Sequence, residues 1–447
     1  MFNKTFKVIL NNKIKPFNKV INVDADKSIS IRSLIVGSIS HNISYVSNIL
    51  ESEDVISTIN CLKKLGVKIY KKKNLYYIYG KGLGSLTAKK NTKLNFGNSG
   101  TLARLLIGLL STNPNISLYL SGDNSLKKRS MKKLILLMSK FGASFYPKGK
   151  FCFPLKMVSS KMPVGIRYKA GVSAQLKSAV IFAGLNSFGN TNVKEVQRSR
   201  DHTENILLGN PKIIKINDQK VKSITIIGKK YLNPLKINIP NDPSSAAFFC
   251  ALTLLNNNSS LTIKNVGLNP TRIGFYKLLK KQGAHIKFKN LTKNNNELRG
   301  DIKIKSSNLK PIKASKFYYT NMTDEYPILF VMAALIKGIS TFKGIDDLAN
   351  KESNRITEMQ KILNQINVKS KFSKGELKIY GQGVVNASSK KIIVPNKGDH
   401  RLCMSAKVLA LLTGAKTTIN NFETVFTSSP SFLKIMKSLG AKFEIKR

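Results

Sequence analysis

The sequence is poor in several kinds of residue and segment, and each scarcity excludes a class of protein. Its 447 residues include only four cysteines, and these lie far apart with no Cys-x-x-Cys spacing, at Cys61, Cys152, Cys250 and Cys403. That pattern argues against a zinc site or a disulfide framework and fits a reducing cytoplasm. No apolar run approaches the roughly 20 residues that span a bilayer, so we expect no membrane segment. The basic N-terminus lacks an apolar core and a small-residue cleavage site, so we expect no signal peptide.

Acidic residues are also scarce, with 23 Asp and Glu against 75 Lys and Arg and a net charge of +52. Such a balance points to nucleic acid, an anionic membrane or an anionic substrate. However, the lysines are spread through the whole chain beside abundant Asn and Ile, without a basic tail or a block of alternating aromatic and basic residues. We interpret the charge as a compositional shift. Only 11 of the basic residues are arginine, so an arginine marks a place where its planar fork can grip a carboxylate or phosphate.

A short pattern recurs along the chain, which is long enough for two or three domains. It consists of an apolar helix end, a glycine and a short alternating strand, and a second strand often follows. Clear copies are CLKKLGVKIY from Cys61, LLMSKFGASFY from Leu136, KLLKKQGAHIKF from Lys277 and KIMKSLGAKFEI from Lys434. A fifth copy has Ile366 in place of the glycine, and NILLGNPKIIKI from Asn205 is a weaker sixth. The pattern predicts an α/β protein of six helix-plus-hairpin units, three per domain, with a crossover near residues 232–245.

Polar clusters precede or open several predicted helices. In DADKSISIRSL, a helix start would place Lys27, Ser28 and Arg32 near an anion. In NFGNSGTLARLL, Ser99 or Thr101 could cap a helix while Gly100 lets the backbone approach a ligand closely. Further clusters occur in GDNSLKKRSM (Arg129), SAQLKSA (Ser173, Gln175), RDHTE (Arg200), TDEYPIL (Asp324), KESNRI (Lys351, Glu352 and Arg355, expected within one helical turn) and GDHRLCMSA (Arg401).

Each cluster alone has a plain structural interpretation as a cap, a solvated turn or an exposed ion pair. Together they show a pattern that capping does not explain. Six of the 11 arginines, Arg32, Arg104, Arg129, Arg200, Arg355 and Arg401, lie at or near predicted helix N-termini. The helix dipole disfavours cations there by a few tenths of a kcal/mol each. The arrangement indicates small anionic ligands that carry phosphate and carboxylate groups.

These motifs, with NDPSSAAFF around Asp242, closely resemble those of the EPSP synthase (3-phosphoshikimate 1-carboxyvinyltransferase) family, in the family's order and over essentially the whole length. The resemblance implies an α/β fold of two domains, each of three repeated βαβαββ-like units, in an inside-out α/β barrel. It places residues 1–22 with 240–447 in one domain, on the phosphoenolpyruvate side, and 23–239 in the other, on the shikimate 3-phosphate side.

The family transfers the enolpyruvyl group of phosphoenolpyruvate to the 5-hydroxyl of shikimate 3-phosphate and releases phosphate. By resemblance, shikimate 3-phosphate would be held by Lys27, Ser28, Arg32, Ser173, Gln175, Arg200, Asp324 and Lys351. Phosphoenolpyruvate would be held by Lys27, Gly100, Arg129, Gln175, Arg355 and Arg401. Asp324 and Glu352 are the candidate acid/base pair, and Lys27 would touch both substrates as a third catalytic group. Arg104 is expected to support the site without contacting substrate.

The resemblance implies no metal and no organic cofactor, and we expect a cytoplasmic monomer without a specific nucleic-acid or membrane partner. Three positions depart from the family pattern: Asn354 stands where Asp is usual, Ser130 replaces a proline and Ser429 an aromatic residue. Two alternatives remain. A sister transferase acting on UDP-N-acetylglucosamine normally uses a loop cysteine, and no cysteine here has such a setting. A basic nucleic-acid-binding protein would show steeply salt-dependent binding.

Overall fold

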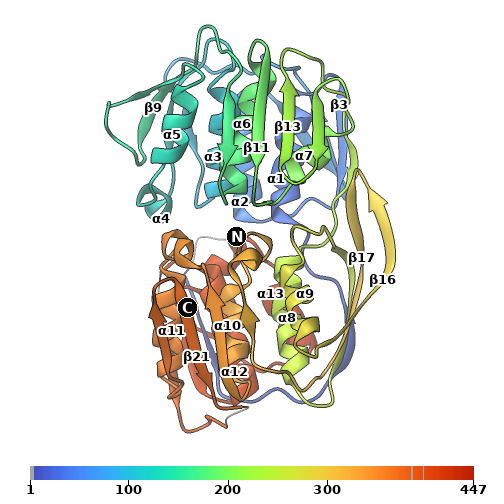
Figure 1. Ribbon diagram of the computed structural model, residues 1–447, viewed down its shortest axis with the longest axis vertical. Coiled ribbons are helices and arrows are strands. Elements are labelled where there is room, and N and C mark those ends of the chain that lie inside the picture. Colours follow the sequence, from blue (N-terminus) through green and yellow to red (C-terminus); the bar gives the residue numbers. More distant parts are fainter. Residues whose placement is uncertain (1–4, 384–385, 396, 447) are drawn as a thin grey trace. The chain divides into compact units, whose positions relative to one another are not determined.

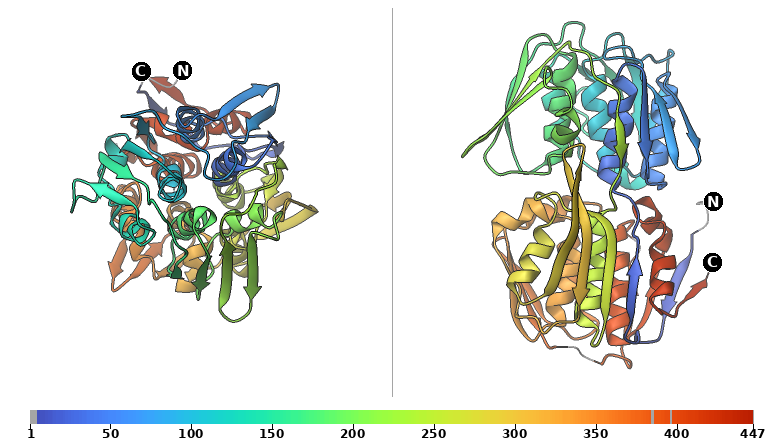
Figure 2. Two further views of the ribbon diagram at one scale, coloured as in Figure 1. Left: turned by 90° about the horizontal axis from the view of Figure 1, so that it is seen from above. Right: turned by 90° about the vertical axis from the view of Figure 1, so that its right-hand side faces the viewer.

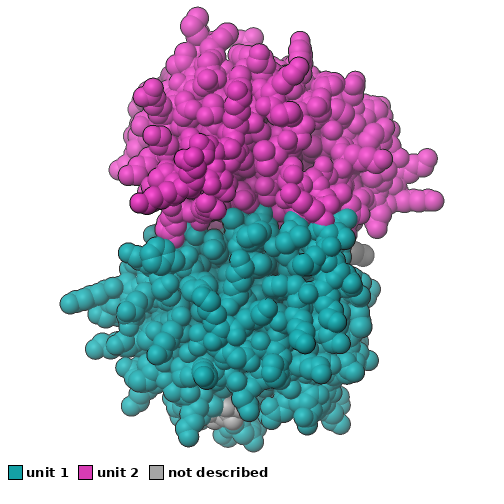
Figure 3. Space-filling view, turned by 45° about the vertical axis from the view of Figure 1, so that its right-hand side comes forward, with its two compact units in different colours: residues 1–24, 240–292, 298–447 teal, residues 25–239, 293–297 magenta. Residues whose placement is uncertain are grey.

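The computed structural model describes residues 5–383, 386–395 and 397–446. The chain folds into two compact units, coloured separately in Figure 3. Unit 1 comprises residues 1–24, 240–292 and 298–447, and unit 2 comprises residues 25–239 and 293–297. We expected boundaries after residues 22 and 239; the units divide after residues 24 and 239, and the short segment 293–297 belongs to unit 2.

Within the residues that the structure describes, six four-stranded sheets share one strand order, which repeats three times in each unit. In unit 2 the sheets run in the orders β14-β3-β5-β4, β6-β7-β9-β8 and β10-β11-β13-β12. In each, the first pair is parallel and the next two pairs are antiparallel. The strands are β3 (Ile43–Ser47), β4 (Lys68–Lys72), β5 (Leu75–Tyr79), β6 (Lys93–Asn95), β7 (Ser117–Ser121), β8 (Ser144–Tyr146), β9 (Leu155–Val158), β10 (Arg167–Ala170), β11 (Asn190–Glu195), β12 (Ile214–Asp218), β13 (Lys222–Ile227) and β14 (Lys236–Asn238).

Unit 1 repeats this order in the sheets β2-β15-β17-β16, β18-β19-β21-β20 and β22-β23-β1-β24. The N-terminal strand β1 pairs with both β23 and β24, so the two ends of the chain share one sheet, as the right-hand view of Figure 2 shows. The strands are β1 (Lys7–Leu10), β2 (Asn18–Ile21), β15 (Ser260–Gly267), β16 (His285–Asn294), β17 (Glu297–Lys305), β18 (Lys313–Ala314), β19 (Gly338–Lys343), β20 (Ser370–Ser373), β21 (Glu376–Gly381), β22 (Lys391–Val394), β23 (Lys416–Ile419) and β24 (Glu444–Lys446).

Helices connect the strands within each repeat (Figure 1). Unit 2 contains α1 (Lys27–Ile39), α2 (Glu53–Lys64), α3 (Gly100–Leu110), α4 (Asn124–Lys127), α5 (Lys132–Ser139), α6 (Ala174–Asn186) and α7 (His202–Leu207). Unit 1 contains α8 (Pro243–Leu255), α9 (Gly274–Lys281), α10 (Tyr326–Ala334), α11 (Arg355–Asn364), α12 (His400–Thr413) and α13 (Phe432–Ser438), with the 3-10 helices η1 (Lys316–Asn321), η2 (Asp346–Asn350) and η3 (Phe422–Thr427).

One helix from each repeat is buried on all sides. These are α1, α3 and α6 in unit 2, and α8, α10 and α12 in unit 1; within each unit they contact one another. Their sequences are apolar or small almost all round, as expected for helices without a solvent face. Each unit has its own apolar core around them. The structure confirms the predicted α/β fold of repeated units with helices inside and sheets outside.

The repeat glycines end their helices as predicted. Gly66, Gly142, Gly283 and Gly440 have φ between 85° and 95°, the left-handed conformation that favours glycine. In the copy that carries Ile366 instead, the next residue, Asn367, adopts φ 63°. Asparagine tolerates this conformation better than other side chains, so the variant copy keeps the same turn.

Candidate active site

In unit 2 the motif residues gather at the N-termini of the central helices. Asp26 caps α1 by accepting from Ile29 N at 2.9 Å. Lys27, in the first turn, forms an ion pair with Asp54 Oδ2 at 2.9 Å, and its side chain is 16% exposed. Ser28 follows and is half-buried. The first turn of α1 therefore presents an ammonium and a hydroxyl beside backbone N–H groups, an arrangement that suits an anion.

Arg32 lies one turn further along α1 and is buried. Its Nε donates to Thr203 Oγ1 at 2.8 Å, and its Nη2 donates to Ser178 Oγ at 3.1 Å. A third donor, Nη1, reaches the carbonyl of Ser28 at 3.0 Å. These bonds join α1, α6 and α7 and fix the guanidinium in one orientation.

The start of α3 faces the start of α6. Ser99 caps α3 by accepting from Leu102 N at 3.2 Å, so of the two residues considered from the sequence it is Ser99 that caps. Gln175 Nε2 donates to Thr101 Oγ1 at 2.9 Å, and Arg104 Nη1 donates to Gln175 Oε1 at 3.0 Å. Arg104 Nη1 also reaches the Gly100 carbonyl at 3.0 Å. Arg104 thus donates hydrogen bonds to two predicted site residues, Gly100 and Gln175.

Gly100 is crowded by two guanidinium groups. A Cβ at this position would lie 2.7 Å from Arg104 Nη1 and 3.2 Å from Arg129 Nη1. Arg129 itself follows α4 and donates from Nη2 to Asn98 Oδ1 and, at 3.3 Å, to Ser125 Oγ. The absence of a side chain at Gly100 leaves room for both arginines beside the helix N-terminus.

The remaining predicted residues of unit 2 lie on the same elements. Ser173 caps α6 by accepting from Leu176 N at 3.4 Å. Arg200 is half-buried in the segment between β11 and α7, two residues before the start of α7. The hydrogen bonds from Arg32 to α6 and α7, and from Gln175 to α3, link these N-terminal turns into one cluster.

In unit 1 the predicted residues surround Arg355, the first residue of α11. Its side chain is 1% exposed. Arg355 Nε donates to Asp399 Oδ2 at 2.9 Å, and Arg355 Nη2 donates to Glu352 Oε2 at 2.7 Å. Burial alone would lower the pKa of Arg355, but Asp399, Glu352 and Asp324 more than offset it, so the pKa is raised. The guanidinium stays charged in a buried position.

Asp324 lies between two arginines. Its carboxylate oxygens are 3.7 Å from Arg355 Nη1 and 3.9 Å from Arg401 Nη2, and its side chain is 24% exposed. Arg401, in the first turn of α12, is buried and lies over the Phe248 ring at 5.9 Å. Asp324 and Glu352 are thus both within reach of Arg355, and both are partly open to solvent.

The KESNRI motif corrects one expectation. Lys351 and Glu352 do not share a helical turn with Arg355, because α11 begins only at Arg355. Asn354, where the family usually has Asp, caps that helix by accepting from Thr357 N at 3.2 Å, so the substitution keeps the cap. Lys351 turns to Asp347, with Nζ 2.6 Å from Asp347 Oδ2.

Sequence reasoning assigned no role to several residues that hold the site. Asp399 caps α12 by accepting from Arg401 N at 3.0 Å while it also binds Arg355. Its position before a predicted helix was a usable signal. Asp54 and Thr203, the partners of Lys27 and Arg32, had no such signal because their contacts depend on how distant helices pack.

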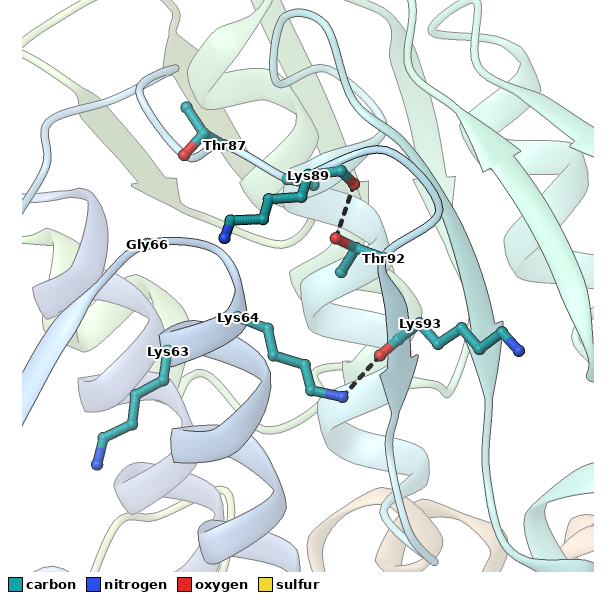
Figure 4. A pocket seen from close by; sticks show the side chains of 8 residues that line it. Lys63, Lys64, Gly66, Thr87, Lys89, Thr92 and Lys93 are labelled. Carbon is teal, nitrogen blue, oxygen red and sulfur yellow. Dashed lines mark hydrogen bonds between the residues drawn. The ribbon is translucent and has the colours of Figure 1, made fainter.

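A lysine-lined cavity of about 590 Å³ lies in unit 2 apart from these residues (Figure 4). Its lining consists of Lys63, Lys64, Gly66, Thr87, Ala88, Lys89, Thr92 and Lys93. Lys64 Nζ donates to the Lys93 carbonyl at 3.0 Å, and Thr92 Oγ1 donates to the Lys89 carbonyl at 2.7 Å. None of the residues predicted for the site lines it. Within the described ranges, no group of three or more metal-ligating side chains occurs, and no helix is long and apolar enough to cross a membrane.

Known proteins share both the sequence pattern and the fold. The family model described as EPSP synthase (3-phosphoshikimate 1-carboxyvinyltransferase) matches residues 11–436. The chain belongs to the EPSP synthase family. A 3-phosphoshikimate 1-carboxyvinyltransferase of Zymomonas mobilis subsp. mobilis is 36% identical over 98% of this chain and 97% of the relative. One of Caldicellulosiruptor saccharolyticus is 38% identical over 96% of this chain and 98% of the relative.

Solved structures agree with this family membership. An EPSP synthase from Acinetobacter baumannii superposes with a TM-score of 0.83 at 32% identity, covering 99% of this chain and 100% of that one. The enolpyruvyl transferase NikO from Streptomyces tendae has a TM-score of 0.75 at 10% identity, covering 99% of this chain and 98% of that one, which shows a shared fold. EPSP synthases are transferases, and the predicted fold class and enzyme class are confirmed.

Proposed function

We propose that this enzyme transfers the enolpyruvyl group of phosphoenolpyruvate to the 5-hydroxyl of shikimate 3-phosphate, giving 5-enolpyruvylshikimate 3-phosphate and phosphate. The observation that carries the proposal is the cluster around Arg355, where two partly exposed carboxylates flank a buried guanidinium with Arg401 beside them. Such a cluster combines cations for an anionic substrate with two groups that can exchange protons.

The reaction needs two proton transfers in each of its two steps. In the addition step, the 5-hydroxyl oxygen bonds to C2 of phosphoenolpyruvate, its proton goes to Asp324, and Glu352 delivers a proton to the methylene carbon C3. In the elimination step, Glu352 removes a proton from C3, the C–O bond to phosphate breaks, and phosphate leaves with the proton that Asp324 had taken, which restores both carboxyl groups. Lys27, which we place beside both substrates, is the further candidate for a proton carrier. The arginines Arg129, Arg355 and Arg401 would stabilise the charge of the tetrahedral intermediate.

The remaining assignments follow the same proposal. Shikimate 3-phosphate would lie against Ser28, Arg32, Ser173, Gln175 and Arg200, with Lys351 and Asp324 nearby, and phosphoenolpyruvate would lie against Gly100, Arg129, Gln175, Arg355 and Arg401. Both ligands carry phosphate and carboxylate, which the helix N-termini and arginines of unit 2 suit. No cofactor takes part. The enzyme would act as a cytoplasmic monomer without a specific nucleic-acid or membrane partner.

The decisive experiment measures phosphate release from phosphoenolpyruvate with three acceptors in parallel: shikimate 3-phosphate, UDP-N-acetylglucosamine and none. Release that depends on shikimate 3-phosphate supports the proposal. A folded protein that releases no phosphate, or that prefers UDP-N-acetylglucosamine, contradicts it.

Two variants test the acid/base pair. Asp324→Asn and Glu352→Gln should each lower kcat by roughly 10²–10⁴-fold, the usual contribution of a positioned proton donor or acceptor. Glu358→Gln is the matched control, because Glu358 lies on α11 and its carboxylate pairs with Lys361. Turnover at the wild-type rate in either test variant removes that residue from the proposed role.

A further inference from the structure

Lys177 is a lysine with no exposed side-chain surface, inside α6. Its Nζ lies 2.7 Å from Glu204 Oε1 and 2.9 Å from Glu195 Oε1. Both glutamate side chains are equally buried. Taking each such charge out of water is unfavourable, and apolar residues of similar volume often stabilise a fold as well or better. Stability alone therefore does not explain why these three charged residues are buried together.

The neighbouring charges nearly balance the cluster. Lys222, on β13, places its Nζ 3.9 Å from Glu204 and 3.8 Å from Asp201. Burial by itself would lower the pKa of Lys177, but the attraction of Glu204 and Glu195 more than offsets it, so the pKa is raised. The ammonium thus remains charged throughout the physiological range and can hold both carboxylates at once.

The two glutamates stand at the two ends of one segment. Glu195 is the last residue of β11, and Glu204 lies in the first turn of α7, so the two residues that contact Lys177 Nζ lie on either side of the loop 196–201. The middle of the loop is held as well. Ser199 donates to Glu195 Oε1 from N at 2.8 Å and from Oγ at 2.6 Å, and its carbonyl lies 3.5 Å from Lys177 Nζ.

This loop and the residues beside Lys177 carry predicted substrate contacts. Arg200 follows Ser199 directly in the loop. Thr203, in the first turn of α7, accepts from Arg32 Nε, and Ser178, next to Lys177, accepts from Arg32 Nη2. The Lys177 ammonium therefore contacts Ser199, which precedes Arg200, and Glu204, which follows Thr203. It thus lies next to Arg200 in the loop and to the two hydroxyls that orient Arg32.

We propose that Lys177 is a positioning residue for the acceptor substrate: it closes the loop 196–201 so that Arg200 and Arg32 meet the phosphate-bearing ligand in a fixed arrangement. It does not touch the substrate. The inference rests on the proposed function, because the ligand that these arginines meet is taken to be shikimate 3-phosphate.

The test compares Lys177→Met with a neutral triple variant, Lys177→Met/Glu195→Gln/Glu204→Gln. The single variant leaves two buried carboxylates without their cation and should lose stability; the triple variant removes that charge imbalance and should recover much of it. In both, the Kd for shikimate 3-phosphate should rise at least tenfold, whereas the KM for phosphoenolpyruvate at saturating acceptor should change less than threefold. If the melting temperature recovers in the triple variant while its affinity for shikimate 3-phosphate stays low, the loss of affinity comes from lost positioning and not from lost stability.

Hydrogen exchange provides a readout that needs no substrate. The amides of residues 199–203 should exchange faster in both variants than in the wild type. Arg272→Met is the control for losing a buried ion pair elsewhere, since Arg272 pairs with Asp242 at 3.1 Å in unit 1. It should lower stability and leave the Kd for shikimate 3-phosphate within twofold.

Each outcome decides between the possibilities. Wild-type affinity in folded Lys177→Met, or full recovery of affinity in the triple variant, overturns the positioning role even if the enzyme is active. Unchanged exchange in the loop overturns it as well. If the wild type neither binds nor turns over shikimate 3-phosphate, the proposed function fails instead, and the exchange experiment still reports whether Lys177 orders the loop.

Discussion

The Asp399 carboxylate binds Arg355 and caps the helix that carries Arg401. Arg355 Nε donates to Asp399 Oδ2 at 2.9 Å, and Arg401 N donates to Asp399 Oδ1 at 3.0 Å. One buried acid thus contacts two of the three arginines that we assign to phosphoenolpyruvate. Asp242 has the same double role in the same unit, because it accepts from Ser244 N and from Arg272.

Asp399→Asn should weaken phosphoenolpyruvate binding. The amide oxygen can still accept from Arg401 N, but the negative charge that holds Arg355 is lost, and breaking a buried ion pair typically costs about 3–5 kcal/mol. We expect kcat/KM for phosphoenolpyruvate to fall by about 10- to 100-fold, measured in the phosphate-release assay. Asp242→Asn is the matched control and should reduce stability with at most a threefold change in that constant. Equal effects of both variants on kcat/KM would show that Asp399 acts only through stability.

Gly100→Ala should affect the same substrate without unfolding the protein. Its Cβ would lie 2.7 Å from Arg104 Nη1 and 3.2 Å from Arg129 Nη1, so the ends of two flexible side chains must move. In a helix, alanine is more favourable than glycine by up to about 1 kcal/mol, and this gain offsets part of the cost of the crowding. We expect the KM for phosphoenolpyruvate to rise about tenfold and the melting temperature to stay nearly constant.

Gly209→Ala is the control for this substitution. Gly209 is exposed, and the nearest atom to an added Cβ is the Ile206 carbonyl oxygen at 3.9 Å. Its kinetic constants should match the wild type. A Gly100→Ala enzyme with wild-type KM would mean that Arg129 does not meet the substrate from the position seen in the structure.

The parts of the site that the sequence predicts are those with local signals. Helix starts are marked by capping residues such as Ser99 and Asp26, so the arginines near them could be placed in advance. The repeat could be recognised because each helix end and its turn lie within a dozen residues. The KESNRI motif shows the limit of this reasoning: Asn354 is itself a cap, and the helix therefore starts after Lys351 and Glu352.

The partners of the site residues could not be predicted in the same way. Arg32 meets Thr203 across 171 positions in the sequence, and Gln175 meets Thr101 across 74. These contacts exist because central helices from different repeats pack side by side, and single-sequence periodicity does not say which helix faces which. The Lys177 cluster could not be predicted for the same reason. From the sequence, a lysine in an apolar helix looks like a solvent-exposed residue, and only the fold places Glu195 and Glu204 beside it.

Lys407 should make the stability of the protein depend on pH. It is fully buried in α12, its Nζ lies 3.3 Å from the centre of the Phe443 ring, and within the described part of the chain no acceptor forms a hydrogen bond with it. Burial lowers the pKa of Lys407 from 10.5 to about 6. Between these values the unfolded chain holds a proton that the folded chain has lost, so the free energy of unfolding rises with pH, by at most about 1.4 kcal/mol per pH unit.

Lys407→Met removes this dependence. Urea unfolding at pH 7, 8 and 9 should show the variant more stable than the wild type at pH 7, with a difference that shrinks by about 1 kcal/mol per pH unit. Lys416→Met, at an exposed position on β23, should keep the wild-type slope. A constant difference across the three pH values would show that the ring of Phe443 keeps the amine protonated.

Thiol chemistry should separate this enzyme from the sister transferase that uses a cysteine. Cys61, Cys250 and Cys403 are buried, and burial raises the pKa of both the Cys61 and the Cys403 thiol to about 12 and that of Cys250 further. A thiol reacts through its thiolate, so these three should resist a disulfide reagent at pH 8 in the native protein. Cys152 is partly exposed and should be the one that reacts quickly.

The enzyme should keep full activity with shikimate 3-phosphate after Cys152 is modified, because no step in the proposed mechanism uses a thiol. Counting the released chromophore alongside phosphate release gives both quantities from one sample, and unfolding in guanidinium should then expose all four cysteines. The Cys152→Ser enzyme is the control and should react slowly at every thiol while turning over at the wild-type rate. Activity lost in step with the first thiol, or abolished in Cys152→Ser, would place a cysteine in the reaction and remove the acid/base role from Glu352.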